Sequence, residues 1–362
     1  MRHSFAGQLR KLRGFRQFLY FPGSNSPILF CMKNLSRFLF FSLVISLLSA
    51  CGGGGSASDG DGKLKIAMVP KGTTHSFWKM VHGGAAKAAQ EEDIDLIWQG
   101  PQKEDDRQMQ IQTMQNFISR GVDAILLAPL DDQALVPSVD AAIKRNIPVI
   151  VFDSDLKSDL QSSFVATDNY LGGKLCAQRM AEVMGGKGKA IMLRYAEGSA
   201  STTNREQGFL DGLKEYGPEI ELISSNQYAG ATMEKGFQAS QNLLNRFGEE
   251  VQAIFTPNES ATMGMLRALQ TAGKAGKVKF IGFDSNETLV AALGAGEIHG
   301  LALQNPFHMG YAAVKTAVAL LKDQPFDKRV DTGVHMVTAE NMNEPAMQEI
   351  LNPELAKWLG EE

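Results

Sequence analysis

The chain has 362 residues, of which 44% are hydrophobic and 21% are charged, and its formal net charge is −4. This composition is ordinary for a globular protein, and the length exceeds that of one typical domain, so we expect two lobes. Residues 1–50 contain seven Lys or Arg and no Asp or Glu, which leaves 29 basic against 40 acidic side chains in the rest of the chain. That remainder, with a formal charge of about −11, offers no basic surface to nucleic acid and excludes it as a partner.

A short apolar run, FLFFSLVISLLS at 38–49, follows Lys33 and Arg37 near the N-terminus. A membrane-spanning helix needs about 20 residues, whereas about a dozen is the length of a signal-peptide core. Met32 directly precedes Lys33, so the signal is complete from Met32. We therefore interpret residues 1–31 as an upstream start-site error, with a genuine long leader as the alternative.

The apolar run ends in Leu-Ser-Ala-Cys at 48–51, and four glycines follow. This string resembles a lipoprotein signal, in which the cysteine is lipidated and becomes the new N-terminus. We predict a signal segment at 1–50, a lipid anchor at Cys51, a flexible Gly/Ser linker at 51–62, and a location in the periplasm or cell envelope. A plain secretory signal or an uncleaved anchor remains as the alternative.

The chain has three cysteines, Cys31, Cys51 and Cys176. Cleavage would remove Cys31 and lipid would occupy Cys51, so no disulfide is expected within one mature chain. Cys176 is expected to be a small core residue on a helix.

From Lys63 onward, short runs rich in Val and Ile alternate with amphipathic stretches of helical length. Strands are predicted at 64–70, 94–100, 124–129, 148–153, 163–167, 189–195, 221–228, 253–258, 279–283 and 299–305. Helices between them include 77–92, 106–120 and 133–144. Such alternation favours parallel sheets, and the pattern runs twice, before and after Thr167. We predict an α/β fold with two doubly wound parallel-sheet lobes of five strands each, in preference to one closed barrel.

Polar residues follow many of the predicted strands. They include the segment 71–78 and the single residues Asp131, Asp153, Asn258, Asp284 and Gln304. Ligands of open α/β sheets bind at the carboxyl ends of the strands. Two such rims facing each other therefore predict a ligand cleft between the lobes.

Five strings carry a family resemblance: PVIVFDSD (148–155), VATDNYLGGK (165–174), NREQGF (204–209), IFTPNESATMGMLRALQTAG (254–273) and FIGFDS (280–285). In this order and spacing, the chain resembles the ribose-binding-protein-like periplasmic solute-binding proteins over about residues 63–340. These are the sugar-binding relatives of the ligand domains of LacI-type repressors.

The resemblance implies the type I periplasmic binding protein fold, in which three crossovers form a hinge. We place the crossovers near Thr167, Asn305 and Gly333. The implied lobes are an N-terminal lobe, 63–167 plus 306–333, and a C-terminal lobe, 168–305 plus 334–362.

A sugar site needs aromatic rings for the C–H faces and several polar groups for the hydroxyls. The resemblance implies these ligand-binding residues: His75, Phe77, Trp78, Asp153, Arg205, Asn258, Phe283, Asp284 and Gln304. The simpler alternatives are helix-start packing for the two aromatics at 77 and 78, a helix cap for His75, and a solvated Arg205. Asp168 and Asn169 are expected to cap a helix.

Three positions depart from the ribose-binding pattern: Ala128, Ser154 and Ala231 stand where ribose binders carry an Asn, an Arg and an aromatic residue. These changes argue for a different or larger ligand than ribose. The candidates to fill the space are Tyr195, Glu197 and Tyr228. Lys71 at the lobe edge leaves an acidic or phosphorylated ligand open as a lesser alternative.

The sequence contains no enzyme motif, and its six histidines show no metal-ligand spacing. We expect no enzyme activity, cofactor or metal. The resemblance implies a monomer that captures a small carbohydrate and delivers it to an ABC transporter permease. The alternative is a ligand-sensing protein for a membrane receptor or kinase. A transcription regulator would need a helix-turn-helix within residues 1–60, where the signal segment lies instead.

Overall fold

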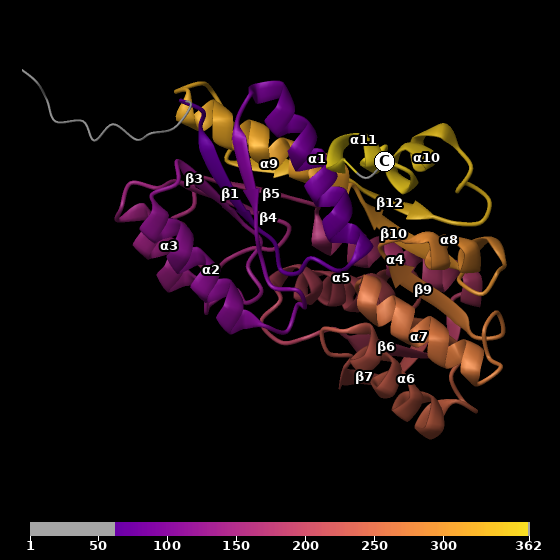
Figure 1. Cartoon of the computed structure of the whole chain (residues 1–362). Coiled ribbons are helices and arrows are strands. Elements are labelled where there is room, and N and C mark those ends of the chain that lie inside the picture. The colour runs from indigo at the N-terminus through magenta and orange to yellow at the C-terminus, as the bar shows by residue number, and fades with distance from the viewer. Residues whose placement is uncertain (1–61, 361–362) are drawn as a thin grey trace, which may run out of the picture. The chain divides into compact units, whose positions relative to one another are not determined.

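Two six-stranded sheets organise the residues that the computed structural model describes, which are 62–360 (Figure 1). The predicted signal segment at 1–50, the anchor at Cys51 and the linker up to residue 61 lie outside the described residues. Within 62–360, none of the helices combines the length and the apolarity that crossing a bilayer requires.

The first sheet has the strand order β11-β5-β4-β3-β1-β2, and all its neighbouring strands are parallel. Its strands are β1 (Lys65–Val69), β2 (Asp95–Trp98), β3 (Ala124–Leu127), β4 (Val149–Phe152), β5 (Ser163–Ala166) and β11 (Arg329–Asp331). Its helices are α1 (Ser76–Glu92), α2 (Arg107–Arg120), α3 (Val136–Ile143) and α9 (Pro306–Leu321).

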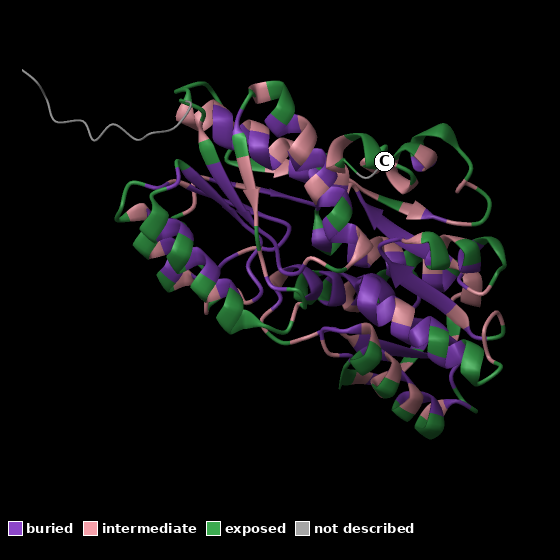
Figure 2. Ribbon diagram, in the orientation of Figure 1, coloured by how far each residue is buried: buried purple, intermediate pink, exposed green. Residues whose placement is uncertain are grey.

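Helices cover both faces of this sheet, which explains the continuous apolar runs of its strands. In β1, Ile66 and Met68 pack with α1 and α9, whereas Ala67 and Val69 pack with α2 and α3. Successive strand side chains point to opposite faces, so every position of such a strand must be apolar. Figure 2 shows the resulting pattern of buried strands between half-exposed helices.

The second sheet has the order β12-β10-β9-β8-β6-β7, which repeats the first sheet strand for strand. Its strands are β6 (Lys187–Arg194), β7 (Glu219–Tyr228), β8 (Ala253–Phe255), β9 (Lys279–Phe283), β10 (Gly300–Gln304) and β12 (Val334–Val337). Its helices are α4 (Asn169–Met184), α5 (Ala200–Tyr216), α6 (Met233–Phe247), α7 (Glu259–Thr271), α8 (Glu287–Gly294) and α10 (Pro345–Leu351). β4 and β9 therefore occupy equivalent places in the two lobes.

The predicted fold, two α/β lobes with mostly parallel sheets, is confirmed. The sixth strand of each sheet, β11 and β12, was not predicted from the sequence. These edge strands have three and four residues and are partly exposed, so they lack the long apolar run that marks the others. β12 also departs from the parallel prediction, because it runs antiparallel to β10.

Within the described residues, the chain passes between the two sheets at 167–168, 305 and 332–333. Two of these crossings are bonded to each other. The hydroxyl oxygens of Thr167 and Thr332 lie 3.2 Å apart, and the N–H of Asp168 donates to Asp331 at 3.2 Å. The first and third crossing segments are therefore held side by side.

The C-terminal tail departs from the predicted assignment of 334–362 to the C-terminal lobe. α10 packs there, with Met347 in the core of that lobe. α11 (Leu355–Leu359) instead lies beside α1 of the N-terminal lobe (Figure 1). Gly83 leaves the necessary space, since a Cβ there would lie 2.7 Å from Leu355 Cδ2. Lys87 Nζ lies 5.6 Å from the Trp358 ring centre.

Candidate functional site

A cavity lies where the carboxyl ends of both sets of strands meet. It brings together eight of the predicted ligand-binding residues: His75, Phe77, Trp78, Asp153, Arg205, Asn258, Asp284 and Gln304. Two further lining residues, Lys71 and Tyr195, were lesser candidates from the sequence. Four lining residues were not predicted: Glu104, Ser201, Thr202 and Glu259. Both lobes contribute to this lining.

Phe283, predicted to form a wall of the pocket, is not among the residues that line the cavity. Phe283 is the last residue of β9, and the next residue, Asp284, lines the cavity instead. The Phe283 ring is fully buried, and the guanidinium carbon of Arg205 lies 4.0 Å from its centre. Phe283 thus packs its ring against the guanidinium group of Arg205.

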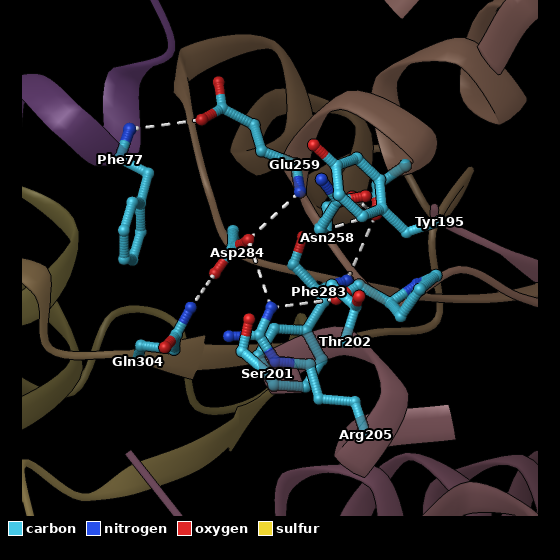
Figure 3. A network of polar contacts seen from close by, with 12 residues as sticks. Phe77, Tyr195, Ser201, Thr202, Arg205, Asn258, Glu259, Phe283, Asp284 and Gln304 are labelled. Atoms are coloured by element: carbon cyan, nitrogen blue, oxygen red, sulfur yellow. Dashed lines mark hydrogen bonds and ion pairs between the residues drawn. The ribbon is translucent and has the colours of Figure 1, made fainter. Parts of the chain in front are cut away.

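Asp284 holds the centre of the site on the C-terminal lobe (Figure 3). Its Oδ1 accepts a hydrogen bond from Gln304 Nε2 at 2.7 Å, and its Oδ2 accepts one from the N–H of Glu259 at 3.0 Å. Burial raises the pKa of Asp284 to about 6, although the charge of Arg205 and the Gln304 hydrogen bond oppose this rise. This carboxyl group therefore titrates close to neutral pH.

Arg205 is buried, with an exposed fraction of 2%. Its Nε donates to Asn169 Oδ1 at 2.8 Å, and its Nη1 donates to the carbonyl of Pro257 at 2.9 Å. The predicted alternative of a solvated arginine is wrong. Asn169, expected to cap a helix, orients Arg205 instead, while Asp168 caps α4 as predicted by accepting from the N–H of Leu171.

Asn258 lines the cavity and also caps α7. Its Oδ1 accepts from the N–H of Ala261 at 3.3 Å, and its Nδ2 donates to Ser260 Oγ at 3.1 Å. Side-chain capping satisfies a backbone donor at the helix start. The cap also fixes the orientation of the amide toward the cavity.

Lys71 and Asp153 form a buried pair that reaches the other lobe. Lys71 Nζ lies 2.9 Å from Asp153 Oδ2 and donates to Ser201 Oγ at 3.1 Å. Next to this pair, Ser154 Oγ accepts from the N–H of Ser201 at 3.1 Å. Since Ser201 belongs to α5, these bonds hold the two lobes in contact, and the described arrangement is a closed one.

Glu259 of the C-terminal lobe caps a helix of the N-terminal lobe. His75 occupies the N-cap position of α1, but its side chain makes no capping hydrogen bond. The Glu259 carboxylate instead accepts from the N–H of Ser76 at 3.3 Å. It also accepts from the N–H of Phe77 at 3.1 Å (Figure 3). A carboxylate at a helix N-terminus is favourable because the N–H groups there lack partners and carry partial positive charge.

Glu104, from the loop between β2 and α2, also contacts both lobes. Its carboxylate accepts from Trp78 Nε1 at 2.6 Å, lies 2.9 Å from His75 Nδ1 and accepts from the Tyr195 hydroxyl. Burial is the largest influence on the pKa of His75 and lowers it, but the charge and hydrogen bond of Glu104, together with the charges of Glu259 and Asp284, raise this pKa to about 9. Burial also opposes ionisation of Glu104, yet His75 and Lys71 lower its pKa to about 2.

Three residues were candidates to fill the space left by the departures from the ribose-binding pattern: Tyr195, Glu197 and Tyr228. Among the described residues, only Tyr195 of these three lines the cavity. Glu197 and Tyr228 are absent from that lining, and Tyr228 is 40% exposed. Glu104 and Glu259 were missed altogether, because acidic residues in a loop or at a helix start ordinarily face solvent.

The cavity can form many hydrogen bonds. Gln304 Oε1 is buried and has no hydrogen-bond partner among the described residues. The rings of Phe77 and Trp78 meet edge to face, with centres 4.9 Å apart. Rings beside dense polar groups suit a compact molecule with hydroxyl groups and an apolar face.

Comparisons with known proteins agree with this geometry. Residues 66–325 match a family described as periplasmic binding protein domain. A D-ribose/D-allose-binding protein of Pseudomonas aeruginosa is 30% identical over 293 residues, which cover 76% of this chain and 89% of the relative.

Two crystal structures extend the likeness to the fold. The periplasmic component of an ABC-type sugar transport system from Hahella chejuensis is 39% identical, has a TM-score of 0.73, and covers 75% of this chain and 99% of its own. An ABC transporter solute-binding protein from Agrobacterium vitis, with D-fucose bound, is 34% identical and has a TM-score of 0.76. That alignment covers 80% of this chain and 100% of the other.

Proposed function

Since this chain belongs to the periplasmic binding protein family, we propose that it captures a small carbohydrate between its lobes and delivers it to an ABC importer. The names of its relatives support this proposal. One is called a ribose- and allose-binding protein, one belongs to an ABC-type sugar transport system, and one was crystallised with D-fucose.

The main support for the proposal is the lining of the cavity, which combines aromatic rings with hydrogen-bonding groups from both lobes. In this site, Phe77 and Trp78 contact the C–H face of the sugar. Asp153 and Asp284 accept hydrogen bonds from its hydroxyls, and Arg205 donates to its oxygens. His75, Asn258 and Gln304 complete the set of ligand contacts.

The charges of the site favour a neutral ligand over an acidic one. Lys71 is paired with Asp153, and Arg205 Nη1 lies 3.9 Å from Asp284 Oδ2. The third cation, His75, faces Glu104. Each positive group is therefore already balanced by a carboxylate, so a ligand carboxylate or phosphate would gain little and would meet nearby negative charge.

Closure provides the mechanism of capture and release. A ligand that bonds to both lobes stabilises the closed arrangement over an open one by the difference in its contacts with the two. The membrane partner then recognises the closed form. A lipid on Cys51, followed by the linker at 51–62, keeps the monomeric protein beside that partner in the cell envelope.

A thermal-shift screen of the purified protein against pentoses, hexoses, deoxysugars and polyols tests the proposal. A ligand present at 100 times its Kd adds about 2.7 kcal/mol to the stability of the folded state. The Asp284→Ala variant is expected to lose this response, whereas Asp140→Ala, a change at a partly exposed position of α3 outside the cavity, keeps it. If no sugar or polyol shifts the wild-type transition, the carbohydrate proposal is wrong.

A further inference from the structure

Glu104 is buried in the cavity and has three hydrogen-bond partners there, although its acidic loop predicts an exposed side chain. It stands in an acidic loop, Glu104-Asp105-Asp106, yet only 9% of its side chain is exposed. Its two oxygens face three side chains from two lobes: His75 and Trp78 from the start of α1, and Tyr195 after β6. A buried carboxylate with three partners is a specific arrangement, because burying an unpaired charge is costly.

We propose that Glu104 is a positioning residue that sets which atoms of His75 and Tyr195 donate and which accept toward the ligand, and thereby selects the sugar. This inference rests on the proposed function and extends it, since none of the five sequence strings includes Glu104.

The donors and acceptors around Glu104 determine the direction of each hydrogen bond. An ionised carboxylate only accepts, so each partner must direct its proton at Glu104. The Tyr195 hydroxyl has one proton, and once that proton points at Glu104 only its lone pairs remain for the ligand. His75 directs its Nδ1 proton at Glu104, which leaves Nε2 as the ring nitrogen that can serve the cavity.

The charged groups around the pair keep this pattern constant near neutral pH. His75 faces the carboxylates of Glu104, Glu259 and Asp284, and these hold its pKa at about 9 despite burial. Glu104 faces His75, Lys71 and the Tyr195 hydroxyl, and its pKa lies at about 2. His75 therefore carries protons on both nitrogens, and its Nε2 donates. The selected sugar must present an acceptor to His75 and a hydroxyl proton to Tyr195.

The test uses Glu104→Gln, which keeps the shape of the side chain but adds two N–H donors and removes the charge. The first measurement is an NMR titration of His75 in the ligand-free protein. In the wild type, His75 should stay protonated from pH 6 to pH 8. In Glu104→Gln, its midpoint should fall to about 6.5 or below. An unchanged titration would overturn the proposal.

The second measurement is calorimetric binding of the sugar found in the screen. Glu104→Gln should weaken binding about 10- to 100-fold, the range for one lost charged hydrogen bond, and binding should become weaker as pH rises from 6 to 8. In a His75→Asn background, this pH dependence should be absent. Unchanged affinity for every sugar in Glu104→Gln would contradict a role in selection.

Asp105→Asn is the matched control. Asp105 is the next residue in the loop and also reaches the other lobe, where its carboxylate lies 2.8 Å from Lys235 Nζ, but it does not line the cavity. Its replacement should change neither the His75 titration nor the sugar preference. If Asp105→Asn reproduces the effects of Glu104→Gln, contact between the lobes explains them and the proposal is wrong.

The two measurements separate this inference from the proposed function. If the wild type binds no sugar, the function fails, and the His75 titration still decides whether Glu104 controls the histidine. If the wild type binds a sugar and Glu104→Gln behaves like the wild type, only the inference fails. A thermal unfolding transition for each variant shows that the compared proteins are folded.

Discussion

Asp153 and Asp284 occupy equivalent positions in the two lobes, directly after β4 and β9, and both adopt a left-handed backbone conformation, with φ of 63° and 66°. Among the described residues, only five other than glycine have a positive φ, and two of them are these cavity carboxylates. This conformation is unfavourable for residues with a Cβ, although Asp and Asn tolerate it better than most. Strain of this kind is typical of functional sites.

Replacing either aspartate by Gly should leave the protein about 1 kcal/mol more stable than replacing it by Ala, because Gly adopts a positive φ without strain. Urea denaturation of Asp284→Gly and Asp284→Ala, and of the same pair at Asp153, measures this difference. Asp140 in α3 is the control, since within a helix Ala is the more stable by about 1 kcal/mol. An Ala variant as stable as the Gly variant at 284 would show that the backbone there is unstrained.

The raised pKa of Asp284 predicts opposite effects of pH on stability and on binding. Burial places this pKa at about 6 in the folded protein, above its ordinary value of 3.8. The contribution of Asp284 to stability is thus fully present below about pH 3.8 and is lost as pH rises through 6. Sugar binding should instead weaken as pH falls below 6, because the protonated carboxyl is a poorer acceptor.

Asp284→Asn, which cannot titrate, is the control for this pH dependence. Calorimetry and denaturation between pH 4.5 and pH 7.5 should show that the variant loses both trends. Persistence of both trends in Asp284→Asn would assign them to another group.

Glu259 should control how far the lobes close, because its carboxylate completes the N-terminus of α1 only when they are in contact. In Glu259→Gln, the neutral amide interacts less with the helix dipole, an effect of up to about 2 kcal/mol in partly buried sites. Small-angle X-ray scattering of the ligand-free variant should give a larger radius of gyration than that of the wild type, and sugar should bind less tightly.

Glu287→Gln is the matched control for closure. Glu287 also stands in the first turn of a helix in the C-terminal lobe, but it is exposed and does not line the cavity. Its replacement should leave the scattering curve unchanged. Equal curves for Glu259→Gln and the wild type would show that this cap does not hold the lobes together.

Cys51→Ser should release the protein from the membrane. If Cys51 carries the lipid anchor, the variant lacks the thiol that the lipid requires, and fractionation should find it in the aqueous fraction. Mass spectrometry of the wild type should show an acylated N-terminal cysteine. Membrane association that survives in Cys51→Ser would contradict the proposed lipid anchor.

The order of strands and helices was predictable from the sequence because it depends on local patterns. A strand buried on both faces must be apolar throughout, as in β1, and a helix between strands must carry an apolar stripe. Residues such as Asp153, Asp284 and Gln304 were recognisable as site candidates because they directly follow strands at the carboxyl edge of a sheet. The family strings then placed Arg205 and Asn258 in the same group.

Contacts between distant parts of the chain were decided only by the tertiary structure. Glu259 caps a helix that begins 183 residues earlier, and Glu104 bonds to Tyr195 across 91 residues. The edge strands β11 and β12, and the position of α11 beside Gly83, likewise depend on partners that no local pattern specifies. The physical reason is that an acidic residue has the same sequence signature whether water or a buried donor solvates it. Only the packed lobes determine which of the two it meets.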